Sequence, residues 1–596
     1  MIRFAPFAIL LFGVACTLQM DSESSQAQKK PQKMVIYQMM TRLFGNQKQT
    51  NKTYGTLEEN GVGKFDDITD KALQSLKELG ITHVWYTGVI EHAVLTDYTA
   101  YGIPLDDADV VKGRAGSPYA IKDYYDVNPD LAKNVDQRME EFESLVDRTH
   151  RNDLKVIIDF VPNHVARAYH SDKKPSEVKD LGEGDDNTKA FLVSNNFYYL
   201  PGESFQVPAD YNSLGPDNSF PTKDGKFDET PAKVTGNNQF TASPGVNEWF
   251  ETVKLNYGVD VINNNSTHFD PIPDTWVKMR DILKYWVEKD VDGFRCDMAE
   301  MVPVEFWHWA IPQVKQANKD VIFIAEIYNP SAYRDYIVEG GFDFLYDKVQ
   351  LYDTLRLLVN GKSATTDIRK IQASLDGINS KMLHFLENHD EQRIASPNFA
   401  TDPWKAIPAM LISAVVDRGP VMIYFGQEVG EPGAGVEGFQ GDDGRTTIFD
   451  YWGVPEHQKW MNGGLFDGAQ LSDDQKKLRD TYSKLLNLAQ SSGAVASGET
   501  IDLTQHNVSQ GNVNASIYSC LRSTPNEVLL VVAGFNPDER SVVLEIPQTE
   551  MDRVGLPSGD LNARAIFGRN GVQKIVDNKL NINLPPYGAI VFKLEG

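Results

Sequence analysis

Four carboxylate residues end short apolar runs in this chain. Asp159 ends KVIID, Asp297 ends GFRCD, Glu326 ends VIFIAE and Asp390 ends FLENHD. If these runs are parallel strands, their carboxyl ends meet at one edge, where a barrel of such strands carries its active site. Carboxylates that converge repel one another, so this group indicates either a bound cation or acid–base chemistry.

The neighbours of these carboxylates favour acid–base chemistry. Arg295 lies two residues before Asp297 on the same run, so both side chains point to one face of a strand. A fixed guanidinium lowers the pKa of an adjacent carboxylate, which suits a nucleophile at Asp297. Glu326 follows three apolar residues, and burial there raises the pKa of a carboxyl group, which suits a proton donor. His164 and His389 flank the same rim as neutral groups, which suit sugar hydroxyls better than a metal ion.

Asp159 has a different expected role. A single Asp at a strand end usually caps a helix or forms an ion pair, so Asp159 is expected to pair with Arg295 and to be structural. Asp297, Glu326 and Asp390 are together predicted to be catalytic. One ionised and one protonated carboxylate in the same site form the pair that cleavage of a glycosidic bond requires.

Apolar runs and amphipathic segments alternate from Met34 onward, and they must position these residues. The amphipathic segments include residues 68–79, 138–150, 275–287 and 365–375. This alternation is typical of βα units around a parallel sheet. Eight such units predict a closed (β/α)8 TIM barrel in the α/β class, with an open doubly wound sheet as the alternative. The apolar runs are residues 35–40, 82–89, 155–161, 291–298, 321–327, 342–347, 382–390 and 421–428.

Two further regions differ in character from the barrel. Residues 165–273, after the third strand, are rich in Asn, Asp, Pro, Gly and aromatic residues and show little helical periodicity. They predict an inserted domain, which leaves residues 34–164 and 274–492 for the barrel. Alternating segments divided by turn residues predict a separate all-β sandwich over residues 493–596.

The first 33 residues predict export. A basic residue precedes an apolar run from Phe4 to Ala15, which is too short to span a membrane as a stable helix. Small residues before Cys16 resemble a bacterial lipobox, so we expect a lipid-anchored protein in the periplasm or at the cell surface. An ordinary cleaved signal peptide is the alternative. The polar residues 21–33 predict a tether.

Charge and cysteine content narrow the classes of partner. Asp and Glu total 83 against 58 Lys and Arg, and the net charge of -25 repels polyanions. This argues against nucleic acid or anionic lipid as a partner and favours a neutral or cationic ligand. Beyond the leader only Cys296 and Cys520 remain, far apart in the chain, so we expect packing residues and neither a disulfide nor a metal site.

Four segments resemble the signatures of the α-amylase superfamily of glycoside hydrolases. They are DFVPNH (159–164), GFRCD (293–297), AEI around Glu326 and FLENHD (385–390), in the family's order across the whole barrel. The resemblance implies that the barrel, the inserted segment and the C-terminal module are the family's domains A, B and C. It also implies cleavage with retention of anomeric configuration, by double displacement through a covalent glycosyl-enzyme.

The resemblance also implies roles for single residues. Asp297 is then the nucleophile, Glu326 the general acid/base and Asp390 the residue that stabilises the transition state. Tyr119, in SPYAIKDYY, matches the family's tyrosine that stacks on the sugar ring. The substrate-binding residues implied in this way are Arg295, His164, His389 and Tyr119.

Departures from the family pattern bear on metal binding. In many amylases an Asp and a His help to hold a structural calcium ion, and the matching segments here contain Lys254, Glu300 and Met301. A Lys ammonium at the position of an anionic ligand should exclude the ion and replace its charge. Asn163, a calcium ligand in many relatives, is therefore expected to form hydrogen bonds near the site. We expect no calcium at that site and no other cofactor, and leave calcium elsewhere open.

The resemblance predicts hydrolysis of α-glucosidic bonds in starch-derived glucans or maltooligosaccharides. VKLN (253–256) resembles a motif of neopullulanases and cyclomaltodextrinases, which act on both α-1,4 and α-1,6 links. One alternative is a glucanotransferase or trehalose-forming isomerase, in which a sugar replaces water at the same intermediate. Another is a non-catalytic glycan-binding protein, against which the intact carboxylates argue.

Overall fold

The computed structural model describes residue 1 and residues 32–595, apart from 218 and 558. The predicted leader, the lipid attachment at Cys16 and nearly all of the predicted tether lie outside the described residues. Lys33, the last residue of that tether, is buried in the folded unit, and its Nζ donates a hydrogen bond to the carbonyl oxygen of Asp417 at 2.9 Å. Within the described ranges, every helix is too short or too polar for a membrane span.

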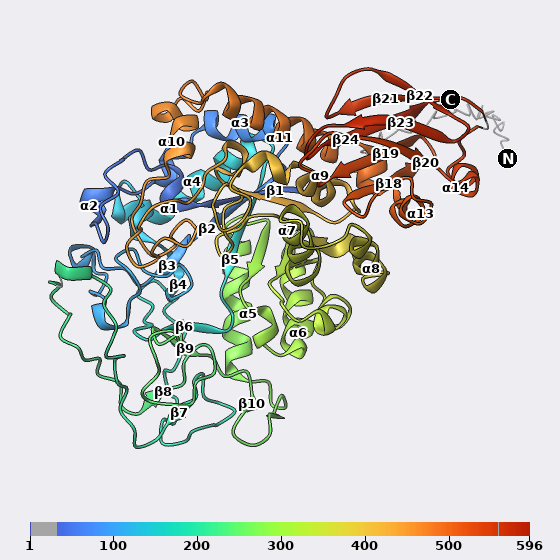
Figure 1. Ribbon diagram of the computed structural model, residues 1–596. Coiled ribbons are helices and arrows are strands. Elements are labelled where there is room, and N and C mark those ends of the chain that lie inside the picture. Colours follow the sequence, from blue (N-terminus) through green and yellow to red (C-terminus); the bar gives the residue numbers. More distant parts are fainter. Residues whose placement is uncertain (2–31, 218, 558, 596) are drawn as a thin grey trace. The chain divides into compact units, whose positions relative to one another are not determined.

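Eight parallel strands form a closed barrel, which confirms the predicted fold class (Figure 1). The strand order is β15-β14-β13-β12-β5-β2-β1-β16, and a parallel bridge between His384 and Val421 joins the two ends, which excludes an open sheet. Each strand lies within a predicted apolar run, because strands covered on both sides need continuous apolar residues. The strands are β1 (Val35–Met40), β2 (His83–Thr87), β5 (Lys155–Phe160), β12 (Gly293–Cys296), β13 (Ile322–Ala325), β14 (Phe344–Tyr346), β15 (Met382–Leu383) and β16 (Val421–Tyr424).

Helix α3 shows how the local sequence defines the helices around the barrel. The Thr69 side chain accepts a hydrogen bond from the backbone N–H of Ala72, which caps the start of the helix. Gly80, with a φ of 103°, ends it in a left-handed conformation that favours glycine. The helices of the barrel region are α1 (Thr41–Phe44), α2 (Leu57–Asn60), α3 (Asp70–Leu79), α4 (Arg138–Arg151), α5 (Asp274–Val287), α6 (Val304–Lys315), α7 (Asp353–Val359), α8 (Thr366–Ser374), α9 (Ile407–Val415), α10 (Pro455–Met461) and α11 (Asp473–Ser491).

The segment 165–273 folds into short paired strands and packs on the chain that follows β2. One small apolar cluster joins Leu95 to Leu214, and a second joins Val110 to Phe250. The segment therefore covers part of the rim at the carboxyl ends of the barrel strands. The pairs are β6 (His164–Ala166) with β9 (Thr252–Lys254), β7 (Tyr199–Leu200) with β8 (Ala232–Lys233), β10 (Val259–Asp260) with β11 (Ser266–Thr267), and, outside the segment, β3 (Ile90–His92) with β4 (Ile121–Val127).

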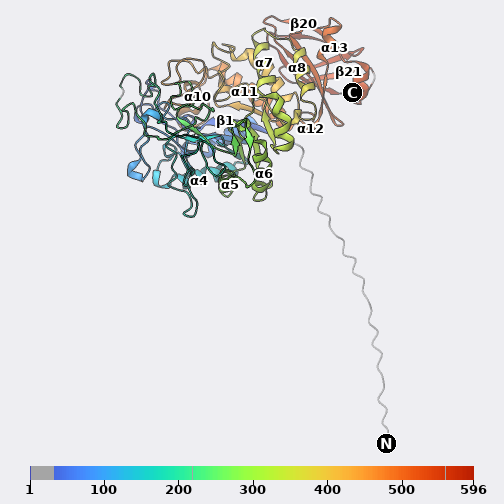
Figure 2. The same ribbon diagram turned by 90° about the horizontal axis from the view of Figure 1, so that it is seen from below.

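The C-terminal module consists mainly of β-strands, as predicted, with three short helices among its described residues. In place of two separate sheets, its eight strands form one continuous antiparallel sheet. Both faces of β19 are buried: Leu529 and Val531 belong to the large core shared with the barrel, whereas Leu530 and Val532 belong to the module's own core. The module thus packs directly on the barrel region, near α8 and α9 in Figure 1 and beside α8 in Figure 2. Its elements are α12 (Gly493–Ser497), β17 (Glu499–Asp502), α13 (Thr504–Ser509), β18 (Ile517–Thr524), β19 (Glu527–Gly534), β20 (Arg540–Glu545), α14 (Gln548–Arg553), β21 (Leu561–Phe567), β22 (Val572–Val576), β23 (Lys579–Leu584) and β24 (Ala589–Glu595).

Candidate active site

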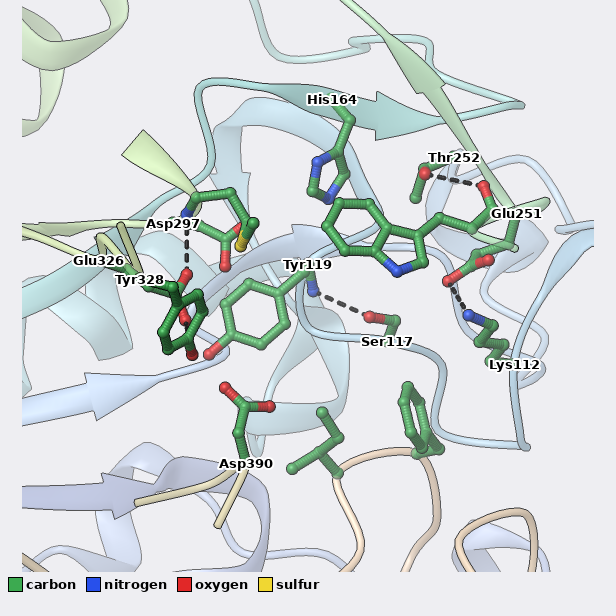
Figure 3. A pocket seen from close by; sticks show the side chains of 14 residues that line it. Lys112, Ser117, Tyr119, His164, Glu251, Thr252, Asp297, Glu326, Tyr328 and Asp390 are labelled. Atoms are coloured by element: carbon green, nitrogen blue, oxygen red, sulfur yellow. Dashed lines mark hydrogen bonds and ion pairs between the residues drawn. The ribbon is translucent and has the colours of Figure 1, made fainter. Parts of the chain in front are cut away.

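A cavity of about 260 Å³ lies at the carboxyl ends of the barrel strands (Figure 3). It brings together Asp297 after β12, Glu326 after β13 and Asp390 beyond β15, as expected from parallel strands whose ends share one edge. Cys296 and Cys520 are both buried and unpaired. The cavity is lined by Lys112, Ser117, Tyr119, His164, Trp249, Glu251, Thr252, Asp297, Met298, Glu326, Tyr328, Asp390, Ile448 and Phe449.

Arg295 links three carboxylates below the cavity. Its buried guanidinium lies 2.8 Å from Asp297 Oδ1 through Nη1 and 2.8 Å from Glu326 Oε1 through Nη2. Nη1 also lies 3.3 Å from Asp159 Oδ1, and the other oxygen of Asp159 accepts the indole N–H of Trp85 at 2.9 Å. Asp159 is therefore partnered on both oxygens and is not among the residues that line the cavity.

The electrostatics of this group favour a retained proton. Burial raises the pKa of Asp297 well above its usual range, Arg295 lowers it, and the carboxylates of Glu326 and Asp159 raise it further. The net direction differs from the lowering expected from Arg295 alone, because one guanidinium serves three carboxylates. Asp297 and Glu326 both contact this one guanidinium, so its charge is divided between them.

Asp390 is ionised beside His389. The Nε2 atom of His389 lies 3.0 Å from Asp390 Oδ2 and 2.5 Å from the Tyr119 hydroxyl, while its Nδ1 lies 2.7 Å from the amide nitrogen of Gln38. The Nε2 side of the ring therefore faces both Asp390 and Tyr119. Burial raises the pKa of Asp390, but His389 and Arg295 outweigh it and lower the pKa to about 2.

Two donors orient Glu326. The Tyr328 hydroxyl donates to Oε1 at 2.7 Å, and the backbone N–H of Met298 donates to Oε2 at 2.8 Å. Met298 directly follows Asp297 and has a φ of 42°, a left-handed conformation that is costly for a residue with a side chain. The carboxylate pattern predicts neither donor. The available signal for Tyr328 is its place two residues after Glu326, on the same strand end.

His164 and Tyr119 line the same cavity (Figure 3). Burial lowers the pKa of His164 to about 3, with further lowering by Lys254 and Lys112, so its ring is neutral. The indole of Trp249 lies against this ring, with centroids 5.2 Å apart. Neutral hydrogen-bonding groups between aromatic rings suit an uncharged, hydroxyl-rich ligand such as a sugar.

Lys254 lies where the family resemblance places the structural calcium ion of many amylases. Its Nζ donates hydrogen bonds to Asn163 Oδ1 and, at 3.0 Å, to the carbonyl oxygen of Met301. The Asn163 amide donates in turn to the carbonyl oxygen of Gly236 at 2.9 Å. Burial lowers the pKa of Lys254 to about 7, and its two acceptors stabilise the charged form. The ammonium group takes the oxygens that a cation would need, which supports the prediction of no calcium there.

An ion pair closes one side of the cavity. Lys112 Nζ lies 2.9 Å from Glu251 Oε1, and both side chains are nearly buried. Figure 3 shows this pair across the cavity from Glu326 and Tyr328. The pair joins the chain between β3 and β4 to the inserted segment just before β9. Sequence reasoning misses it, since its members lie far apart in the chain and in no recognisable motif.

Residues 38–450 match the family described as "Alpha amylase, catalytic domain". The chain belongs to the α-amylase family of glycoside hydrolases. The α-amylase of Streptomyces lividans is 25% identical over 587 residues, which cover 90% of this chain but only 56% of that protein. α-Amylase 3 of Dictyoglomus thermophilum is 24% identical, and the alignment covers 91% of this chain and 91% of that protein. Neopullulanase 2 of Thermoactinomyces vulgaris is 20% identical, with 94% of this chain and 77% of that protein covered.

Solved structures of the α-amylase family share this fold. The α-amylase of Geobacillus thermoleovorans, complexed with acarbose, has a TM-score of 0.61 at 18% identity and covers 96% of this chain and 100% of its own. A noncanonic maltogenic α-amylase of Thermotoga neapolitana has a TM-score of 0.59 at 19% identity, with coverages of 94% and 99%. The predicted family and barrel are thereby confirmed.

Proposed function

We propose that this glycoside hydrolase cleaves α-glucosidic bonds in starch-derived glucans or maltooligosaccharides and retains the anomeric configuration. We propose α-1,4 bonds as the substrate, and the VKLN segment makes α-1,6 bonds a second candidate. Relatives named α-amylase and neopullulanase support the substrate class. The observation that carries the mechanism is the pair of 2.8 Å contacts from one guanidinium to Asp297 and Glu326 at the same cavity.

In the first step, an Asp297 oxygen attacks the anomeric carbon while Glu326 gives its proton to the leaving oxygen. The bond between the anomeric carbon and that oxygen breaks, and a glycosyl ester of Asp297 forms. At this step Glu326 must carry the proton and Asp297 must be ionised. Arg295, in contact with both carboxylates, stabilises the Asp297 anion in that arrangement.

In the second step, ionised Glu326 takes a proton from water, and the water oxygen attacks the anomeric carbon. The ester bond breaks, Asp297 leaves as a carboxylate, and two inversions at one carbon give net retention. The Tyr328 hydroxyl and the Met298 N–H donate to Glu326 and stabilise its anion between the two steps.

The remaining residues bind the sugar at which the bond breaks. Asp390 is ionised, so it can accept hydrogen bonds from sugar hydroxyls and stabilise positive charge that develops on the ring. His164 supplies a neutral ring and Tyr119 an aromatic ring, and His389 contacts both Asp390 and the Tyr119 hydroxyl. Arg295 is a positioning residue, because its contacts are to carboxylates below the cavity.

Proton NMR of products during early turnover of a maltooligosaccharide tests this proposal. We expect the α-anomer of the newly released reducing end to form first, before mutarotation. Asp297→Asn should abolish cleavage, whereas Asp147→Asn, the same change at an exposed position on α4, should leave it unchanged. Early β-anomer, or undiminished cleavage by Asp297→Asn, contradicts the proposal.

A substrate panel separates hydrolysis from the alternatives. Maltooligosaccharides, pullulan, cyclodextrins, sucrose and trehalose are incubated with the protein, and products are resolved by chromatography. Panose from pullulan supports action of the neopullulanase type. Products longer than the substrate favour a glucanotransferase, and interconversion of disaccharides favours an isomerase. Absence of any product favours a non-catalytic glycan-binding protein.

A further inference from the structure

We propose that Glu91, Asp126 and Asp172 bind a calcium ion at a site separate from the catalytic cavity. Glu91 lies on β3 and Asp126 on β4, two strands that pair with each other beside the barrel (Figure 1). Asp172 lies shortly after β6. None of the three residues lines the catalytic cavity, and none contacts Lys254, so this site differs from the one where relatives were expected to hold calcium.

The positions of the three carboxylates fit a calcium ion. One oxygen from each residue lies within 4.8 Å of the others. Calcium–oxygen distances are about 2.3–2.6 Å, so two ligands on opposite sides of the ion are about 4.6–5.2 Å apart. Glu91 and Asp126 are buried and Asp172 is exposed. The ion can therefore enter from the side of Asp172, where water completes the six to eight ligands that calcium takes.

Glu91 provides a second and independent indication of a ligand. It is 1% exposed, and its Oε2 has no hydrogen-bond partner among the described residues. A buried carboxylate oxygen without a partner costs free energy, which a bound cation removes. Asp126 differs, because its Oδ2 accepts from Arg138 at 2.8 Å and its Oδ1 accepts from the Val127 N–H at 2.8 Å. A carboxylate oxygen can accept in more than one direction, so these contacts leave room for a metal ion.

The local charge balance favours a divalent cation. The three proposed ligands and Asp123 place four carboxylates in this region, and among the described residues only Arg138 forms an ion pair with any of them. The next cation, Lys122, pairs with Asp106 at 3.0 Å. Burial raises the pKa of Glu91 well above its usual range, and Asp126 and Asp123 raise it further. A proton on Glu91 neutralises one charge, whereas a calcium ion neutralises two and also bridges three side chains.

Calorimetric titration of the chelator-treated protein with calcium chloride tests the proposal, together with thermal melting in calcium or in chelator. We expect one calcium ion per chain and a higher melting temperature with calcium. Glu91→Gln should weaken binding about tenfold or more, because calcium affinity depends strongly on ligand charge. Glu177→Gln, the same change at an exposed position near Asp172, should bind as the unaltered protein does.

Two results overturn the proposal: no calcium binding and no change of melting temperature, or equal affinity in Glu91→Gln and Glu177→Gln. If Glu91→Gln fails to fold, Asp172→Asn replaces it, because Asp172 is exposed and its removal leaves no buried cavity. Weakened binding in Asp172→Asn supports the site, and unchanged binding contradicts it. Mutation of this site should not alter the catalytic residues, so cleavage at saturating calcium is expected to persist in both variants.

Discussion

Asp297 and Glu326 carry the same functional group but have different hydrogen-bond donors. Both contact Arg295 at 2.8 Å. Glu326 also accepts from Tyr328 and from the Met298 N–H, whereas the pKa of Asp297 is raised by burial. In the proposed mechanism, these additional donors stabilise the Glu326 anion that takes up a proton from water. Environment, and not residue type, separates the two roles.

Glu326→Gln should slow hydrolysis of maltooligosaccharides by about 10²–10⁴-fold, because glutamine cannot protonate the leaving oxygen. With α-glucosyl fluoride, whose leaving group needs no such proton, the first release of fluoride should be close to normal in rate. Rapid-quench measurement of the fluoride burst checks this difference.

Glu300→Gln is the matched control for Glu326→Gln. Glu300 accepts hydrogen bonds from the backbone N–H groups of Tyr328 and Asn329 and does not line the cavity. Glu300→Gln should therefore change the reaction rates with both substrates only weakly and to the same extent. Equal slowing of the two substrates in Glu326→Gln would contradict the assignment of Glu326 as the acid.

At the scale of the elements, the barrel is closed by side chains as well as by strands. His384, at the seam between β15 and β16, lies between two carboxylates: its Nε2 is 3.0 Å from Asp417 Oδ2 and its Nδ1 is 3.4 Å from Asp347 Oδ2. Burial lowers the pKa of His384, but Asp417 and Asp347 outweigh it and raise the pKa from 6.5 to about 9. A buried imidazolium therefore connects three neighbouring strand ends.

This seam predicts a loss of stability at alkaline pH. The pKa of His384 is higher in the folded than in the unfolded protein. Its contribution to the free energy of unfolding is therefore complete below pH 6.5 and is lost as the pH rises through about 9. The shift corresponds to roughly 3 kcal/mol of unfolding free energy. Urea unfolding over this pH range should show the decline in the free energy of unfolding. His384→Asn should be less stable at low pH, and its free energy of unfolding should change less with pH. An equally steep decline in the variant would contradict the prediction.

The Lys112–Glu251 pair should limit how far a glucan extends on one side of the cavity. The pair lies across the cavity from Glu326 (Figure 3). In the proposed mechanism the leaving group departs toward Glu326, so we expect the side with the pair to hold the non-reducing end of the glucan. Lys112→Ala should open that side. The rate of cleavage of maltooligosaccharides blocked at the non-reducing end should then rise several-fold relative to the rate for unblocked ones. Lys133→Ala, at an exposed position, is the control. No change in this ratio would show that the pair does not restrict the substrate.

At the scale of the whole molecule, the barrel and the C-terminal module share a core. Alternate residues of β19 face the large core and the module's core, so one strand is packed on both sides. Thr365, just before α8, adds hydrogen bonds from its hydroxyl to the carbonyl oxygens of Ala515 and Ile517, each at 3.0 Å. Such an interface predicts that the two regions unfold as one cooperative unit.

All nine tryptophans precede residue 461, so their fluorescence reports on the barrel region and inserted segment alone. Leu530→Ala, in the module's own core, should cost about 2–5 kcal/mol and lower the unfolding midpoint that tryptophan fluorescence detects. Val572→Ala, at an exposed position of β22, is the control. An unchanged midpoint in Leu530→Ala would show that the two regions unfold independently.

The sequence by itself determined the barrel, the all-β module and the convergence of Asp297, Glu326 and Asp390. Buried parallel strands need continuous apolar runs, and parallel ends share one edge, so both results follow from local pattern. The spacing of Arg295 and Asp297 likewise placed two side chains on one face of a strand.

Only the tertiary structure decided features that depend on distances between remote segments. These include the Lys112–Glu251 pair, the donors on Glu326 and the grouping of Glu91 with Asp126 and Asp172. The direction of the Asp297 pKa belongs here too. Local sequence shows the nearby Arg295, but burial and the number of carboxylates that share its charge appear only once the chain is folded.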